Sequence, residues 1–99
     1  MAATTHKHHQ LEGLPFTVRL FKEGETYIAH VPELDVSSCA DTVQQVKKNI
    51  NDAVLLLLES AADMGTLEEI LEEAGYHLKG QPWQAPELVS LDRQTLSVK

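Results

Sequence analysis

Hydrophobic and polar side chains alternate along residues 14–22, LPFTVRLFK, with Phe16, Val18 and Leu20 on one side of the chain. A period of two residues is typical of a β-strand that buries one face. A Glu-Gly pair ending at Gly24 follows at once, and glycine can adopt the positive φ that tight hairpin turns need. The pattern therefore predicts a first strand that ends in a two-residue turn.

Two further strands are expected after this turn. Residues 25–31 alternate in the same way, and Pro32 ends the run because proline has no N–H to donate to a ladder. The short run of residues 35–40 predicts a third strand, antiparallel to the second. The first part of the chain should therefore form a small antiparallel sheet.

The spacing of apolar residues becomes helical after this point. Thr42 can cap a helix, and Gln45 stands three residues later, which is the spacing of a capping box. The apolar residues that follow recur at helical intervals and form one stripe: Val43, Val46, Ile50, Ala53, Val54 and Leu57. Leu55 and Leu56 lie off this stripe, so we expect the later elements of the chain or another subunit to cover them.

A second, shorter helix is expected after Gly65. Thr66 and Glu69 repeat the capping-box spacing, and the helix should run to Ala74 and stop at Gly75.

The chain divides into three parts. Residues 1–13 are polar and without period and are interpreted as a disordered lead-in, residues 14–80 as the folded domain, and residues 81–99 as a linker with a C-terminal strand extension. Within the extension, residues 88–91 and 95–98 predict one or two strands. The expected fold is α+β, in the order β-β-β-α-α-β, with a mainly antiparallel sheet of three or four strands and one main helix on one face.

Composition and charge narrow the possible functions. Ninety-nine residues, 42% of them hydrophobic, suit one folded domain. The formal net charge is −7, and residues 33–79 account for all of it, with ten carboxylates against three lysines. Phosphate binding needs clustered Lys and Arg, so we do not expect direct nucleic-acid binding. The charge suits a partner with a basic surface, and solubility alone is the other explanation.

Cys39 is the only cysteine, which excludes an internal disulfide and a cysteine zinc cluster. The sequence has no recognisable signal peptide and no apolar run long enough to cross a bilayer, so we expect a cytoplasmic protein without a membrane partner. His6, His8 and His9 have no fixed geometry for a metal and belong to the polar lead-in.

A hairpin ending in YIAHVPEL, then a short strand and an Asp-Thr helix cap, resembles the HicB-like antitoxin family. Members typically carry Y-x-A-x-x-P-[DE]-L before such a cap. The matching positions here are Tyr27, Ala29, Pro32, Glu33, Leu34, Asp41 and Thr42. The resemblance covers about residues 16–60. The DNA-binding domain that often ends these proteins is not expected, because only a strand-like tail follows Trp83.

The resemblance implies a partial RNase H-like fold and a role in neutralising a small, basic, RNA-cleaving toxin of the HicA type by occluding its RNA-binding face. The alternative is a stand-alone dimeric structural or regulatory domain without a toxin partner. Because Pro32 breaks the second strand, we expect Glu33 and Asp35 to project toward a basic partner. The competing acidic surface is on the second helix: Glu68, Glu69, Glu72 and Glu73.

We also expect a homodimer, because a small sheet leaves an edge strand with unpaired backbone groups. Leu55, Leu56 and Trp83 are the candidate dimer or packing residues, and for Tyr76 and Trp83 core packing is the favoured interpretation.

Three kinds of catalytic chemistry are considered and none is favoured. RNase H-type nucleases hold two metal ions among clustered carboxylates, but the first strand offers no inward carboxylate to join the candidates Glu33, Asp35, Asp41 and Asp52. A thiol nucleophile would need an oxyanion element beside Cys39 and His30, so a small buried sulfur is the favoured interpretation. The serine candidates, Ser37 and Ser38, lack the glycine turn of a nucleophile elbow. We therefore expect no enzyme and assign no catalytic, cofactor-binding or metal-binding residue.

Overall fold

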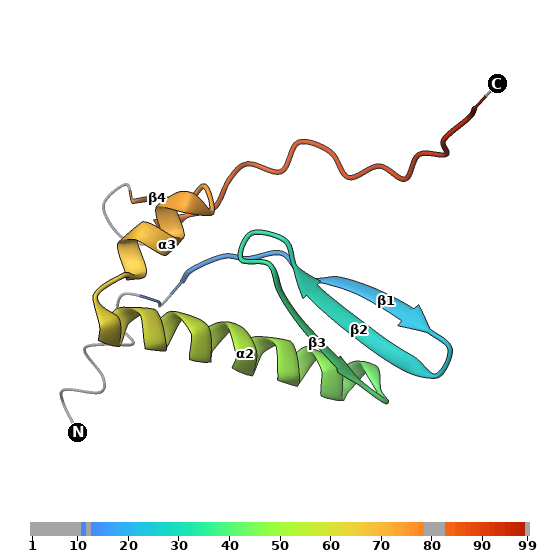
Figure 1. Cartoon of the computed structure of the whole chain (residues 1–99), viewed down its shortest axis with the longest axis horizontal. Helices are drawn as coiled ribbons and strands as arrows, with labels where there is room; N and C mark the ends of the chain where they lie inside the picture. Colours follow the sequence, from blue (N-terminus) through green and yellow to red (C-terminus); the bar gives the residue numbers. More distant parts are fainter. Residues whose placement is uncertain (1–10, 12, 79–82, 99) are drawn as a thin grey trace.

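The computed structural model describes residues 11, 13–78 and 83–98, and it confirms the α+β class (Figure 1). Three antiparallel strands form one sheet in the order β1-β2-β3, a long and a short helix follow, and two short strands pair separately. The elements are β1 (Arg19–Glu23), β2 (Thr26–Val31), β3 (Val36–Ala40), α2 (Val43–Met64), α3 (Leu67–Glu73), β4 (His77–Leu78) and β5 (Trp83–Gln84).

The first strand begins at Arg19, later than the expected residue 14. Arg19 is paired with His30, so continuing the same register would bring Thr17 opposite Pro32, which has no N–H to offer. The hairpin turn is also one residue later than expected, at Gly24-Glu25, between the paired residues Glu23 and Thr26. Gly24 has φ 58°, as the turn requires.

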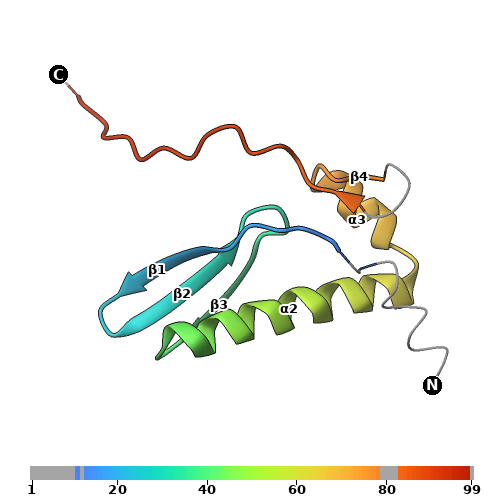
Figure 2. The ribbon, with the colours of Figure 1, turned by 180° about the vertical axis from the view of Figure 1, so that it is seen from behind.

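The long helix α2 lies across one face of the sheet (Figures 1 and 2). Its expected cap is confirmed, since the Thr42 hydroxyl accepts the backbone N–H of Gln45 at 3.1 Å. Its buried stripe is Val46, Ile50, Val54, Leu58 and Ala61, which continues the predicted stripe through Leu58 in place of Leu57. The stripe packs on Ala29 and Val31 of β2, both fully buried.

The short helix α3 is held by Leu67 and Leu71, which are buried. The capping box expected at its start is not formed, because the Thr66 hydroxyl donates to the carbonyl of Ala61 at 3.4 Å and caps nothing in α3. The expected stop is present at Gly75, which has φ 95°. A Cβ at Gly75 would lie 2.8 Å from the Pro86 ring, so this position also lets the last part of the chain cross close to the end of α3.

The C-terminal segment differs most from expectation. Trp83 and Gln84, placed in a linker by the sequence, form β5 and pair with β4, while residues 79–82 lie outside the described part. Neither a helix nor a strand is assigned over residues 85–98, so the strands predicted at residues 88–91 and 95–98 are wrong. A strand needs a neighbour to bond with, and high β-propensity alone does not supply one.

Of the expected lead-in, only Leu11 and Gly13 lie within the described residues. Among the helices of that described part, none combines the length and the apolar character needed to cross a bilayer.

Candidate functional site

One end of the sheet gathers three segments that are distant in the sequence: residues 14–18, which we call the strap, the turn between β2 and β3, and Tyr76 after α3. Both carboxylate oxygens of Glu33 in the turn lie 3.1 Å from the backbone nitrogen of Thr17 in the strap. The Tyr76 hydroxyl donates to the carbonyl of Pro15 at 2.6 Å. Side chains therefore bond two backbone groups of the strap, the Thr17 N–H and the Pro15 carbonyl, and the strap lies outside the β-ladder.

The Tyr76 phenol is buried at this junction, with 2% of the residue exposed. Burial, and then the nearby negative charge of Glu33, raise its pKa from 10.0 to about 12. Both effects favour the neutral phenol, which is the form that can donate to Pro15. The hydroxyl is therefore a structural donor at physiological pH.

The outer face of the sheet, opposite α2, carries a chain of three polar side chains. An Arg19 guanidinium nitrogen lies 2.9 Å from His30 Nδ1, and His30 Nε2 lies 3.0 Å from Asp35 Oδ1. A guanidinium can only donate, so Nδ1 must accept and the proton must sit on Nε2, which donates to Asp35. Both ring nitrogens are therefore engaged in the neutral tautomer.

The two carboxylates expected to face a partner are unlike each other. Glu33 is half-buried and tied to the strap. Asp35 has a side chain that is 94% exposed, and its backbone is left-handed with φ 54°, a conformation that aspartate tolerates better than most residues. Only Asp35 is presented to solvent as the sequence led us to expect.

Beyond this polar chain, the outer face is mixed. Phe21, Ile28 and Cys39 lie side by side across the three strands, and the Arg19 guanidinium lies 5.5 Å from the centre of the Phe21 ring. Cys39 is exposed, so its interpretation as a buried sulfur is wrong. Although His30 shares this face with Cys39, its engagement with Arg19 and Asp35 leaves no free nitrogen to act as the base of the thiol.

Three of the carboxylates considered for a metal pair are each bonded to a different group. Glu33 binds the strap, Asp35 binds His30, and Asp52 pairs with Lys48 one helical turn away at 2.9 Å. Within the described residues, no group of three or more His, Cys, Asp or Glu side chains is placed to hold a metal ion.

The turn between β2 and β3 and the end of α3 border the same shallow groove, of about 350 Å³. Pro32 and Glu33 line it from the turn, Ala74 from the end of α3, and Glu87 and Leu88 from the C-terminal segment. The turn and the end of α3 therefore border one groove, whose charged lining residues are Glu33, Glu87 and Arg19.

The candidate dimer residues also separate into two kinds. Trp83 is 5% exposed and belongs to the core, in agreement with its expected packing role. Leu55 and Leu56 are 44% and 66% exposed, so the later elements of the described chain leave them open to solvent. Leu55 borders an apolar hollow of about 330 Å³ together with Leu11, Leu14 and Phe16.

Sequence reasoning missed the Arg19–His30–Asp35 chain and the strap. The cross-strand pairing of Arg19 with His30 follows from the turn position, and a turn at Gly24-Glu25 would have revealed it. No local sequence pattern predicts the contact of Glu33 with Thr17, because the two residues are sixteen positions apart.

Comparisons with protein-family models, with curated proteins and with solved structures find no match to this chain.

Proposed function

We propose that this chain is an antitoxin-like protein-binding module that neutralises a small, basic, RNA-cleaving toxin of the HicA type by occluding its RNA-binding face. The observation that carries the proposal is a set of exposed carboxylates that we call the acidic end: the side chains of Asp35 in the turn between β2 and β3 and of Glu68, Glu69, Glu72 and Glu73 on α3.

The acidic end suits a basic partner for a physical reason. None of the ten carboxylates of residues 33–79 is buried, and the four glutamates of α3 all face solvent. Exposed like charges steer an oppositely charged protein before contact and raise its association rate. A toxin that binds RNA must carry such a basic face.

A binding role is also favoured by the state of the polar side chains on the sheet. The imidazole of His30 is held in one tautomer between Arg19 and Asp35, and the Glu33 carboxylate is used by the strap. These groups stabilise the turn from which Asp35 projects. Their bonds support a rigid surface more readily than a reacting centre.

The second candidate is a stand-alone dimeric domain without a toxin partner. The observation that favours it is the exposed apolar surface of Leu55 and Leu56 on α2, which no other described element covers. A homodimer is compatible with both candidates.

The test uses the product of a short, basic open reading frame beside the gene of this chain. A variant with Asp35→Lys, Glu69→Lys and Glu73→Lys should associate with it at least tenfold more slowly at low salt, since steering is lost. Asp35→Lys with Glu69→Lys alone should slow association in the same direction, and its matched control, Glu23→Lys with Glu25→Lys, reverses the same number of exposed charges at the hairpin tip and should retain most of the rate. Unfolding curves of all the variants check that the fold is intact.

The inhibitory role is tested in the same system. The purified chain should suppress RNA cleavage by the basic protein, and the triple charge reversal should abolish that suppression. Equal loss of association in the two double variants would show that the acidic end is not the contact surface. Binding without any inhibition of cleavage would contradict the antitoxin function.

A further inference from the structure

The edge of the sheet formed by β1 is open. β1 pairs with β2 on one side only, and four of its five residues are exposed. The backbone N–H and C=O groups that point away from β2 have no ladder partner in the described part of the chain. Such an edge is a template for a further strand.

The same chain carries an unpaired segment that could add to such an edge. Residues 85–98, which we call the tail, are extended and outside any ladder. Five large apolar side chains of the tail are 64–87% exposed: Leu88, Val89, Leu91, Leu96 and Val98. An apolar, extended segment with free backbone groups gains most by adding to a sheet edge.

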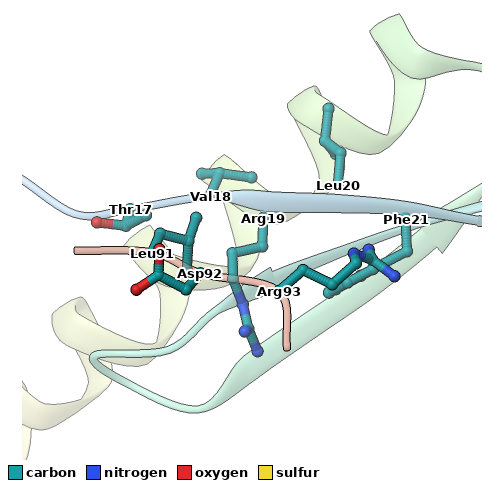
Figure 3. A pocket seen from close by; sticks show the side chains of 8 residues that line it. All are labelled: Thr17, Val18, Arg19, Leu20, Phe21, Leu91, Asp92 and Arg93. Atoms are coloured by element: carbon teal, nitrogen blue, oxygen red, sulfur yellow. The ribbon is translucent and has the colours of Figure 1, made fainter. Parts of the chain in front are cut away.

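The tail passes close to β1 but does not pair with it. Leu91, Asp92 and Arg93 lie beside residues 17–21 across a hollow of about 550 Å³ (Figure 3). After this approach the tail and β1 separate, and the end of the tail projects away from the rest of the chain (Figures 1 and 2). The part that carries Leu96 and Val98 is thus presented outward.

We propose that residues 88–98 of a second copy of the chain add as a strand to the open edge of β1, in a reciprocal exchange about a two-fold axis. In such an exchange each copy gives one tail and receives one, so the contact closes at a dimer. A second copy is the occupant because the chain's own tail diverges from its β1 toward the C-terminus (Figures 1 and 2).

Length and charge agree with this exchange. Residues 88–98 outnumber the five residues of β1. At the usual rise of about 3.3 Å per residue in a strand, they are long enough to pair along the whole of β1. β1 presents Arg19 and Lys22 with Glu23, and the tail presents Asp92 and Arg93, so opposite charges are available on both partners. The proposal is independent of the toxin, because it concerns only contacts between copies of this chain.

Light scattering on the full chain at tens of micromolar is the first test. The wild type should give about twice the 11.0 kDa chain mass, and Leu91→Asp with Leu96→Asp should give the monomer mass. The matched control, Gln94→Asp with Ser97→Asp, adds the same charge to the tail without removing an apolar side chain and should remain dimeric. A monomeric wild type, or a dimer that survives the leucine changes, overturns the proposal.

Cross-linking then identifies the occupant of the edge. In a Cys39→Ser background, one variant carries Glu23→Cys on β1 and an isotope-labelled variant carries Ser97→Cys on the tail. A flexible bismaleimide should join the two different chains, as read by mass. A chain with both changes that cross-links within itself, at a yield independent of concentration, would show that the tail closes on its own β1 and would overturn the exchange. Tail-to-tail products alone would overturn it as well.

Discussion

The strap and the tail are both extended segments that run beside the sheet without joining its ladder, yet the structure treats them differently. The strap turns Phe16 and Val18 toward the core and has its backbone held by Glu33 and Tyr76. The tail has more large apolar residues but leaves all five exposed. Hydrophobicity alone therefore does not fix an extended segment. Polar side chains that reach its backbone, or a strand beside it, are also needed.

Among changes to the strap, the tail and their contacts, removing the Tyr76 side chain should cause the largest loss of stability. Tyr76→Ala deletes a buried ring and the donor to Pro15 together, and we expect the free energy of unfolding to fall by about 3 kcal/mol. Urea denaturation followed by circular dichroism measures the change. A loss below about 1 kcal/mol would mean that the strap is fixed by something other than Tyr76.

Removing the Glu33 carboxylate should cause the next largest loss of stability. Glu33→Ala leaves the Thr17 N–H without its partner, and we expect a loss of about 1 to 2 kcal/mol in the free energy of unfolding. Asp35→Asn is the control two residues away, because asparagine tolerates the left-handed backbone there and the pair of the solvated carboxylate with His30 should contribute less than about 1 kcal/mol. Equal effects of the two substitutions would remove the distinction between them.

Alkaline pH should loosen the strap through Tyr76. Its pKa in the folded chain is about 12 against 10.0 for the free side chain, so the unfolded state loses this proton first as the pH rises. The stability that comes from the raised pKa is complete below pH 10.0 and is lost between pH 10.0 and about 12. We expect a loss on the order of 1 kcal/mol by about pH 11 relative to Tyr76→Phe, which lacks the phenol. If the free energy of unfolding of the wild type and of Tyr76→Phe fell in parallel as the pH rose, Tyr76 would not be the cause of the alkaline loss.

Changes in the tail should have the smallest effect on the monomer. At concentrations below dimer formation, Leu96→Ser should alter the free energy of unfolding by less than about 0.5 kcal/mol, because the side chain is already in water. Phe16→Ser in the strap is the comparison and should be clearly destabilising. A large effect of the tail substitution at high dilution would show that the tail packs on its own chain.

The strap and the tail also illustrate which parts of the fold can be predicted from the sequence. The sequence predicts strands over residues 14–22 and 25–31 and a helix after Thr42 because period and caps are local properties, and the structure has the hairpin at residues 19–31 and the helix at residues 43–64. The Arg19–His30 pair was hidden because a turn placed one residue early shifts the cross-strand pairing by two residues. The tail was predicted as strand from its β-branched and apolar residues, but whether a strand forms depends on a neighbouring edge that local sequence does not encode.

Of the two carboxylates in the turn between β2 and β3, only one is exposed as predicted, and the reason is the same. Asp35 is exposed and has a left-handed backbone, while the carboxylate of Glu33, two residues earlier, bonds the Thr17 N–H of the strap. The sequence places both carboxylates after Pro32, and only the packing of distant segments separates their roles.

Amide hydrogen exchange of the monomer, resolved residue by residue, tests the contrast between strap and tail most directly. The Thr17 N–H should be protected in the wild type and lose most of its protection in Glu33→Ala, while the amides of residues 88–98 exchange as fast as those of an unfolded peptide. Rapid exchange at Thr17 in the wild type, or protection in the tail at dilutions where the chain is monomeric, would contradict the account.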